Sequence, residues 1–277
     1  MPELGTQAIN PNRALWEKGD FTRIAGTMRQ SGEELVATLA IAPGMEMLDL
    51  GCGDGTTALP AATLGANVLG IDIAANLVAA GNARAAAAGL DNLRFQQGDA
   101  SDLAGIPDAR FDLVVTCFGA MFAPRPLDVA REMVRVTRPG GRIVMGNWIP
   151  GDPTLVAQIL KICSAYTPPP PEGFVSPMTW GDEDVVRERF QAAGIAPADV
   201  SFERATWVFR HDGSPVELLA LFRDYYGPTM NAFEAAAKSG RDQQLGEELT
   251  ALFAAQNRGG DRTEIPATFL KVTAAKR

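Results

Sequence analysis

Short apolar segments alternate with amphipathic segments through the first half of the chain. Runs rich in β-branched or aromatic residues are typical of buried strands, and they cover residues 45–50, 68–73, 93–97, 111–118 and 142–148. Apolar positions at helical spacing lie between them, over residues 56–64, 75–88 and 126–136. A further helix is expected over residues 32–40. The alternation predicts a parallel, doubly wound α/β sheet.

The alternation stops after Trp148. Helices are predicted over residues 154–165, 183–193, 215–226, 230–238 and 242–256, and strands over residues 201–209 and 268–273. Four consecutive prolines, Pro168 to Pro171, must be extended because they lack N–H donors. Several bulky aromatic side chains also lie in this part. We interpret residues 151–260 as a helical lid over an acceptor site, and a homodimer interface is the alternative.

Composition narrows the function. The 277 residues include 46% hydrophobic and 21% charged residues, which is typical of a globular protein. The net charge of −8 argues against nucleic acid or an anionic membrane as partner, since both need a cationic face. No segment resembles a transmembrane helix or a signal peptide, so we expect a cytoplasmic protein. Three scattered cysteines and one histidine favour neither disulfides nor a metal site.

The segment LDLGCGDGT, residues 48–56, carries the most specific chemistry. It follows a predicted strand and opens a helix, so its glycines bring the backbone and the free N–H groups of the helix close to a ligand. A dinucleotide fingerprint needs its third glycine at position 56, but that residue is Thr56. Asp49 would repel a pyrophosphate and suits a ligand with an amine. The alternative is a tight turn without a ligand.

Acidic residues end the next two predicted strands. Asp72 lies about twenty residues after the glycine loop, where an acid binds ribose hydroxyls in nucleotide-binding βαβ units. Its alternative role is to cap the helix that follows. Asp99 ends the third strand, where a turn aspartate is the alternative. Because three polar strand ends occur in succession, we favour a ligand site at this edge of the sheet.

As a set, these segments resemble the class I S-adenosylmethionine-dependent methyltransferases, and among them the ubiquinone/menaquinone-biosynthesis-type (methyltransferase type 11) enzymes. The resemblance covers residues 30–150. It rests on residues 48–56, 72, 98–100, 111–115 and 132–141. It implies a Rossmann-like, mostly parallel seven-stranded sheet, S-adenosylmethionine as cofactor, and methyl transfer to a small-molecule acceptor.

The resemblance also implies how the glycine loop holds the cofactor. Gly51 and Gly53 would pass beneath the methionine part, with Cys52 at the variable position between them. Asp49 would hold the loop and the amino group. These four residues therefore form the expected methionine side of the site.

The nucleoside side follows from the next two strand ends. By resemblance, Asp72 takes both ribose hydroxyls and Ile73 lies against the adenine. Asp99 accepts a hydrogen bond from the adenine amino group, and the Ala100 N–H meets a ring nitrogen. The two acids would thus fix the two halves of the adenosine.

No catalytic residue is assigned. A sulfonium methyl is already electrophilic, so alignment and exclusion of water can supply most of the rate, and a base is needed only for a protonated acceptor. Residues 117–124 read CFGAMFAP, whereas the family's DNA and amide methyltransferases carry an Asn/Asp-Pro-Pro-aromatic signature there. Its absence argues against methylation of bases or glutamine and favours a small acceptor.

Other candidates have structural alternatives. By resemblance, Cys117 and Phe118 border the methionine part and the reacting methyl. Cys117 is a reactive thiol or, more typically for a buried strand end, an inert one. His211 is a base or part of a surface turn. Tyr225 and Tyr226 line the acceptor site or pack a helix end.

We therefore expect an N-terminal arm (1–30), a cofactor-binding Rossmann-like core (31–150), a helical lid and acceptor region with one late strand (151–260), and a closing strand of the core sheet (261–277). Two other functions compete with methyl transfer. One is a nicotinamide-dependent oxidoreductase, which the misplaced third glycine disfavours. The other is a cofactor-binding or partner-binding protein without catalysis.

Overall fold

A seven-stranded sheet lies at the centre of the computed structural model, which describes residue 10 and residues 12–277. The strands are β1 (Glu46–Leu50), β2 (Asn67–Asp72), β3 (Leu93–Gln97), β4 (Phe111–Cys117), β5 (Thr137–Trp148), β6 (Val200–His211) and β7 (Thr263–Ala275). Their order is β3-β2-β1-β4-β5-β7-β6. β1 to β5 run parallel, and β7 runs antiparallel to β5 and β6. The predicted mostly parallel α/β sheet is confirmed.

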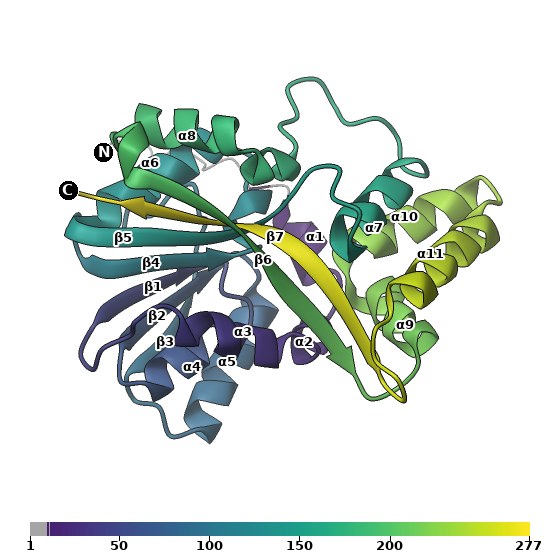
Figure 1. The fold of residues 1–277 in the computed structure, drawn as a ribbon, viewed down its shortest axis with the longest axis horizontal. Helices are drawn as coiled ribbons and strands as arrows, with labels where there is room; N and C mark the ends of the chain where they lie inside the picture. Colours follow the sequence, from purple (N-terminus) through teal and green to yellow (C-terminus); the bar gives the residue numbers. More distant parts are fainter. Residues whose placement is uncertain (1–9, 11) are drawn as a thin grey trace, which may run out of the picture.

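Helices cover both faces of this sheet (Figure 1). On one face lie α3 (Arg29–Ala37), α4 (Ala58–Thr63) and α5 (Ala75–Ala87), and on the other lie α6 (Pro126–Val136) and α8 (Glu183–Ala192). Because β1 and β4 are buried on both sides, their sequences read as almost continuous apolar runs. This burial explains why the first half of the chain was predictable from its pattern.

A separate helical group lies beyond one end of the sheet (Figure 1). It consists of α7 (Leu155–Ser164), α9 (Pro215–Tyr225), α10 (Gly227–Lys238) and α11 (Asp242–Gln256), which pack against one another. Ser214 begins α9 with a capping box, in which Glu217 bonds back to the Ser214 N–H. The long β6–β7 pair extends toward this group. No helix of the described residues is long and apolar enough to cross a membrane.

Short elements connect these layers. They are the helices α1 (Asn12–Glu17) and α2 (Thr22–Gly26) and the 3₁₀ turns η1 (Ala120–Phe122), η2 (Pro177–Gly181) and η3 (Pro197–Asp199). Residues 1–9 and 11 of the expected N-terminal arm lie outside the described residues. The rest of that arm is not a separate unit, because α2 packs against α9 and α1 packs against α5 and α10.

The expected lid region also divides differently. Its late strand is β6, which pairs with β7 over the full length from Val200 to His211, and α8 packs on α6 at the face of the sheet. Both therefore belong to the core, and the helical group alone lies outside it. The tetraproline segment is an exposed loop between α7 and η2.

β7 is longer than the sequence pattern indicates. The predicted strand covers residues 268–273, whereas β7 includes Pro266, and proline is normally confined to strand edges or ends. In the structure, β5 pairs with β7 only over residues 269–275, whereas Pro266 faces Val208 of β6. The proline is tolerated because β5 does not pair with β7 at that point.

Candidate active site

An open cavity of about 950 Å³ lies at the carboxyl ends of β1, β2 and β4, where ligands bind in doubly wound sheets. All the predicted cofactor residues except Asp49 line it: Gly51, Cys52, Gly53, Asp72, Ile73, Asp99, Ala100, Cys117 and Phe118. Chain segments up to seventy residues apart in the sequence thus meet at one edge of the sheet, as the register of a parallel sheet requires.

Asp49 lies beneath the cavity rather than in its wall. Its side chain is buried, and the Thr57 hydroxyl donates a hydrogen bond to it. Burial raises the pKa of Asp49 to about 7 because a charged carboxylate is disfavoured away from water. Asp49 therefore ties β1 to the start of α4, which is half of its expected role, while its contact with an amino group stays a prediction.

The glycine loop leaves room above itself. Gly53 has a φ of +55°, and a Cβ built on it would meet nothing within 4 Å. Its N–H donates to Asp72 Oδ2 at 2.8 Å. Any other residue would strain the backbone and project a side chain into the open space. The loop thus forms a cradle of the kind that a bound cofactor fills.

An arginine clamp that sequence reasoning missed holds this loop from behind. Asp54 is 2% exposed and pairs with Arg29 of α3 through both carboxylate oxygens. The Arg29 Nη1 also donates to Thr56 Oγ1 at 2.7 Å, and Arg84 of α5 donates to the Asp54 carbonyl at 2.6 Å. A buried carboxylate needs such partners. No local sequence signal pairs Arg29 with Asp54, because 25 residues separate them.

Asp72 combines its two proposed roles. Its Oδ1 accepts from the Ala74 N–H at 2.9 Å, just before α5, while Oδ2 accepts from Gly53. Burial raises the pKa of Asp72. A carboxylate offers about four acceptor positions, and the backbone bonds from Gly53, Ile73 and Ala74 do not use all of them. Asp72 therefore braces the loop and the helix start and still has capacity for ribose hydroxyls.

Asp99 is likewise part of a turn and part of the cavity wall. Its Oδ1 accepts from the Ser101 N–H at 2.8 Å and the Ser101 hydroxyl at 2.7 Å, as an Asx turn requires. Its Oδ2 accepts from Asn10 Nδ2 at 3.0 Å. The turn interpretation is thus correct for one oxygen, and the other oxygen is reached by a residue from the N-terminal segment.

Phe118 has a strained backbone at the end of β4. Its φ is +61°, which is rare for a bulky residue and costs about 1–3 kcal/mol. The Phe118 N–H donates to the Gly146 carbonyl at 2.9 Å, and its ring stacks on Trp148 at a centroid distance of 3.7 Å. These contacts hold the ring at the boundary of the cavity.

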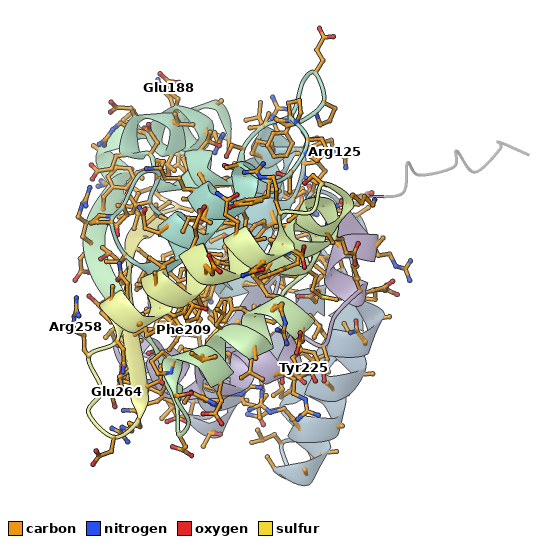
Figure 2. The ribbon with its side chains drawn as sticks, turned by 90° about the vertical axis from the view of Figure 1, so that its right-hand side faces the viewer. Arg125, Glu188, Phe209, Tyr225, Arg258 and Glu264 are labelled. Atoms are coloured by element: carbon orange, nitrogen blue, oxygen red, sulfur yellow. The ribbon has the colours of Figure 1, made fainter. Side chains whose placement is uncertain are left out.

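A second cavity of about 340 Å³ adjoins the first. The residues that line both are Trp16, Phe21, Met28, Phe118 and Phe122. The residues that line only the second are Ile24, Trp148, Val156, Phe209, Phe222 and Tyr226. Phe209 of β6 lies under the helical group (Figure 2). The centroid of its ring is 5.5 Å from that of Phe222 of α9. The second cavity is therefore an aromatic pocket between the sheet, α2 and the helical group.

The N-terminal segment supplies wall residues that sequence reasoning missed. Asn10, Asn12, Trp16, Phe21, Ala25 and Met28 all line the first cavity. The Asn12 side chain donates to the Phe122 carbonyl and Trp16 packs edge-on against the Phe122 ring. Trp16 and Phe21 were the available signal, since large aromatic residues in a polar segment need a partner.

From the region beyond residue 150, only Trp207 lines the first cavity among the described residues. Residues 151–260 therefore contribute little to this cavity, and their expected role as a lid over the acceptor stays a prediction. The indole N–H of Trp207 is buried, and no hydrogen-bond partner for it is found among the described residues. A buried donor without a partner is costly.

The remaining candidates fall into two groups. His211 ends β6 opposite Thr263, and Tyr225 lies beside the Arg23 guanidinium; neither residue lines either cavity. Tyr226 is buried and lines the second cavity. Burial raises the pKa of Cys117 well above its usual value, which supports the inert interpretation because a protonated thiol is a poor nucleophile.

Comparisons with known proteins agree with this architecture. A family model described as "Methyltransferase domain" matches residues 48–145. The uncharacterized protein Rv1403c of Mycobacterium tuberculosis is 34% identical over 229 residues, which cover 82% of this chain and 81% of that protein. Nocamycin O-methyltransferase of Saccharothrix syringae is 36% identical over 141 residues, 47% of this chain and 50% of that enzyme.

A solved structure shows the same fold. It is an N-methyltransferase of Haemonchus contortus in complex with phosphomonomethylethanolamine and S-adenosylhomocysteine. The match covers 98% of this chain and 61% of that chain, with 15% sequence identity and a TM-score of 0.60. The open glycine cradle and the carboxylates Asp72 and Asp99 fit a cofactor with an amine, a ribose and an adenine. The cofactor is S-adenosylmethionine, and the chain belongs to the class I S-adenosylmethionine-dependent methyltransferases.

Proposed function

We propose that the protein transfers a methyl group from S-adenosylmethionine to a small-molecule acceptor held in the second cavity. One observation carries this proposal: the two cavities adjoin and share the wall around Phe118. A cofactor on the glycine loop and an acceptor in the aromatic pocket would then meet beside Phe118, where the two cavities adjoin. The wall of this pocket is predominantly hydrophobic and aromatic, as the walls of small-molecule sites usually are.

The first cavity would hold the cofactor along the strand ends. We assign Gly51, Cys52 and Gly53 to its methionine part, and Cys117 and Phe118 to the neighbourhood of the reacting methyl. Two observations support this assignment: Gly53 leaves open space above the loop, and the Phe118 ring lies at the border with the second cavity. The methyl group would therefore lie on the acceptor side.

The nucleoside part would extend toward β2 and β3. We assign Asp72 to the ribose hydroxyls, Ile73 to the face of the adenine, and Asp99 and the Ala100 N–H to its edge. Support comes from their common place in the cavity wall and from the remaining acceptor capacity of Asp72. Asp49 would act from below, by holding the loop.

When bound, the cofactor supplies an electrophilic methyl group. The task of the chain is then to hold the acceptor in line and to exclude water, which raises the rate without a fixed catalytic group. Among the described residues that line the second cavity, Tyr226 has the single titratable side chain. Burial raises its pKa, so it does not serve as a base near neutral pH. We assign no catalytic residue.

The named relative supports an acceptor of low molecular mass. Nocamycin O-methyltransferase shares the matching part of its chain with this protein at 36% identity. Its name describes methylation of an oxygen, and we extend to this chain only the size class of the acceptor. The acidic net charge of −8 supports the same class, because a nucleic-acid substrate needs a basic surface.

A labelling experiment tests the proposal. The protein is incubated with S-adenosylmethionine that carries a radioactive methyl group and with an extract of its source organism, divided by filtration into small molecules and macromolecules. We expect label in the small-molecule fraction, and none with heat-inactivated protein. Label confined to protein or nucleic acid would contradict the proposal, whereas the assignment to the methyltransferase family would stand.

A further inference from the structure

We propose that the acceptor is an uncharged molecule that inserts a planar aromatic ring into the second cavity. This inference rests on the proposed function, since it names the class of molecule that the same site takes. It follows from the charge, the shape and the position of the wall of the cavity, which are argued in turn below.

The charge of the wall excludes an ionic ligand. No Asp, Glu, Lys, Arg or His is among the described residues that line the second cavity. The first cavity is different, because Asp54, Asp72 and Asp99 contribute to its wall. Transfer of an ion from water to an apolar site without a charged partner costs far more than transfer of a neutral molecule. The two cavities thus separate a charged cofactor from an uncharged acceptor.

The shape of the wall favours a flat ring. Phe118 and Trp148 are stacked with an angle of 5° between their planes, and this pair forms one side of the pocket. Other rings of the wall meet edge to face, since Phe222 lies at 65° to Phe209 and at 70° to Tyr226. Aromatic rings pair best in offset stacks and edge-to-face contacts. A planar aromatic ligand makes both kinds of contact here.

The position of the pocket connects it to the chemistry. Phe118 belongs to both walls, and its left-handed backbone fixes the ring at the junction. Trp16 and Phe21 close the same junction from the N-terminal helices. A ring in the second cavity would therefore place a substituent toward the reacting methyl, while its other end lies against Val156 and Tyr226.

Matched probes test the charge and the planarity. Binding of 1-naphthol, 1-naphthoate and 1-decalol is measured at pH 7 with S-adenosylhomocysteine present, by quenching of the indole fluorescence and by calorimetry. We expect 1-naphthol to bind, and both the anion and the saturated alcohol to bind about tenfold more weakly or worse. Equal binding of 1-naphthoate would overturn the uncharged class, and equal binding of 1-decalol would overturn the planar one.

Two substitutions test the location. Val156→Asp places a carboxylate in the wall, and Val216→Asp makes the same change at an exposed position of α9. We expect the first to weaken 1-naphthol about tenfold or more and the second to have no effect, with the affinity for S-adenosylhomocysteine kept in both. If Val156→Asp does not fold, Val156→Thr adds one hydroxyl at nearly constant volume, and about a threefold loss or more is expected.

Unchanged 1-naphthol binding in the folded Val156 variant would overturn the location. The failure of the proposed function is a different result. It shows as labelled macromolecules in the fractionated extract, whatever the three probes do.

Discussion

Gly119 and Gly51 approach each other backbone to backbone. A Cβ on Gly119 would lie 2.2 Å from the carbonyl oxygen of Gly51, and a Cβ on Gly51 would lie 2.7 Å from the carbonyl carbon of Gly119. Both distances are shorter than any ordinary contact. The turn after β4 and the glycine loop after β1 are therefore fitted to each other, and together they fix the floor of the cofactor cavity.

The first prediction concerns this fit. Gly119→Ala forces the two segments apart, because the obstructing atoms are backbone atoms. We expect a loss of about 1–3 kcal/mol in the free energy of unfolding and about a tenfold or greater loss of affinity for S-adenosylhomocysteine, measured by thermal denaturation and calorimetry. Gly105→Ala is the matched control, since a Cβ there meets nothing within 4 Å. A Gly119→Ala protein that behaves like the control would show that the floor is not rigid.

These two glycines also show what the sequence can and cannot reveal. Gly51 is recognisable because its neighbours in the chain form a known motif. Gly119 belongs to no local motif, and its requirement arises only when β4 lies beside β1. Arg29 is invisible for the same reason, since its partner Asp54 is defined by tertiary packing. Sequence patterns therefore located the cofactor residues but not the residues that hold them.

The acceptor side was predictable only in outline. The aromatic residues of the later half were noticed, and Phe222 and Tyr226 do line the second cavity. Trp16 and Phe21 are large aromatic residues in a polar segment, but nothing in their spacing indicates that α1 and α2 fold back over the strand ends. Non-local contacts of this kind leave no periodic signal.

The second prediction separates the two functions of Asp72. Asp72→Asn keeps an acceptor for the Ala74 N–H but removes the charge and one acceptor. We expect S-adenosylhomocysteine to bind about tenfold to a hundredfold more weakly, since a hydrogen bond to a charged group contributes about 1.5–3 kcal/mol. The measurement is calorimetry, with thermal denaturation alongside.

Asp182 provides the control for this change. It caps α8 by accepting from the Asp184 and Val185 N–H groups and lines neither cavity. Asp182→Asn should affect stability slightly and affinity not at all. If Asp72→Asn also left the affinity unchanged, Asp72 would be a structural brace alone.

The third prediction concerns pH. The folded-state pKa of Asp49 is about 7, above its ordinary value of 3.8, so between these values the native state holds a proton that the unfolded state has lost. The contribution of Asp49 to stability therefore falls as pH rises from about 4 to about 7 and stays low above that range. We expect the melting temperature of the wild type to fall more steeply from about pH 4 to about pH 7 than that of Asp49→Asn, at constant ionic strength. Parallel slopes would contradict an elevated pKa.

The fourth prediction identifies the moving cover of the cofactor. Residues of α1 and α2 line the first cavity, whereas the tetraproline loop lines neither, so the N-terminal helices and not residues 168–176 should respond to the cofactor. We expect S-adenosylhomocysteine to slow amide hydrogen exchange over residues 12–28, because bound ligand removes open states of the segments that contact it. Exchange over residues 168–176 should not change. Phe222 of α9 and Tyr226 just after it line only the second cavity. Exchange over α9 should therefore slow when an acceptor or 1-naphthol is added and not with S-adenosylhomocysteine alone. Protection of the tetraproline loop by the cofactor, with α1 and α2 unaffected, would contradict this prediction and place the cover of the cofactor in the later half of the chain.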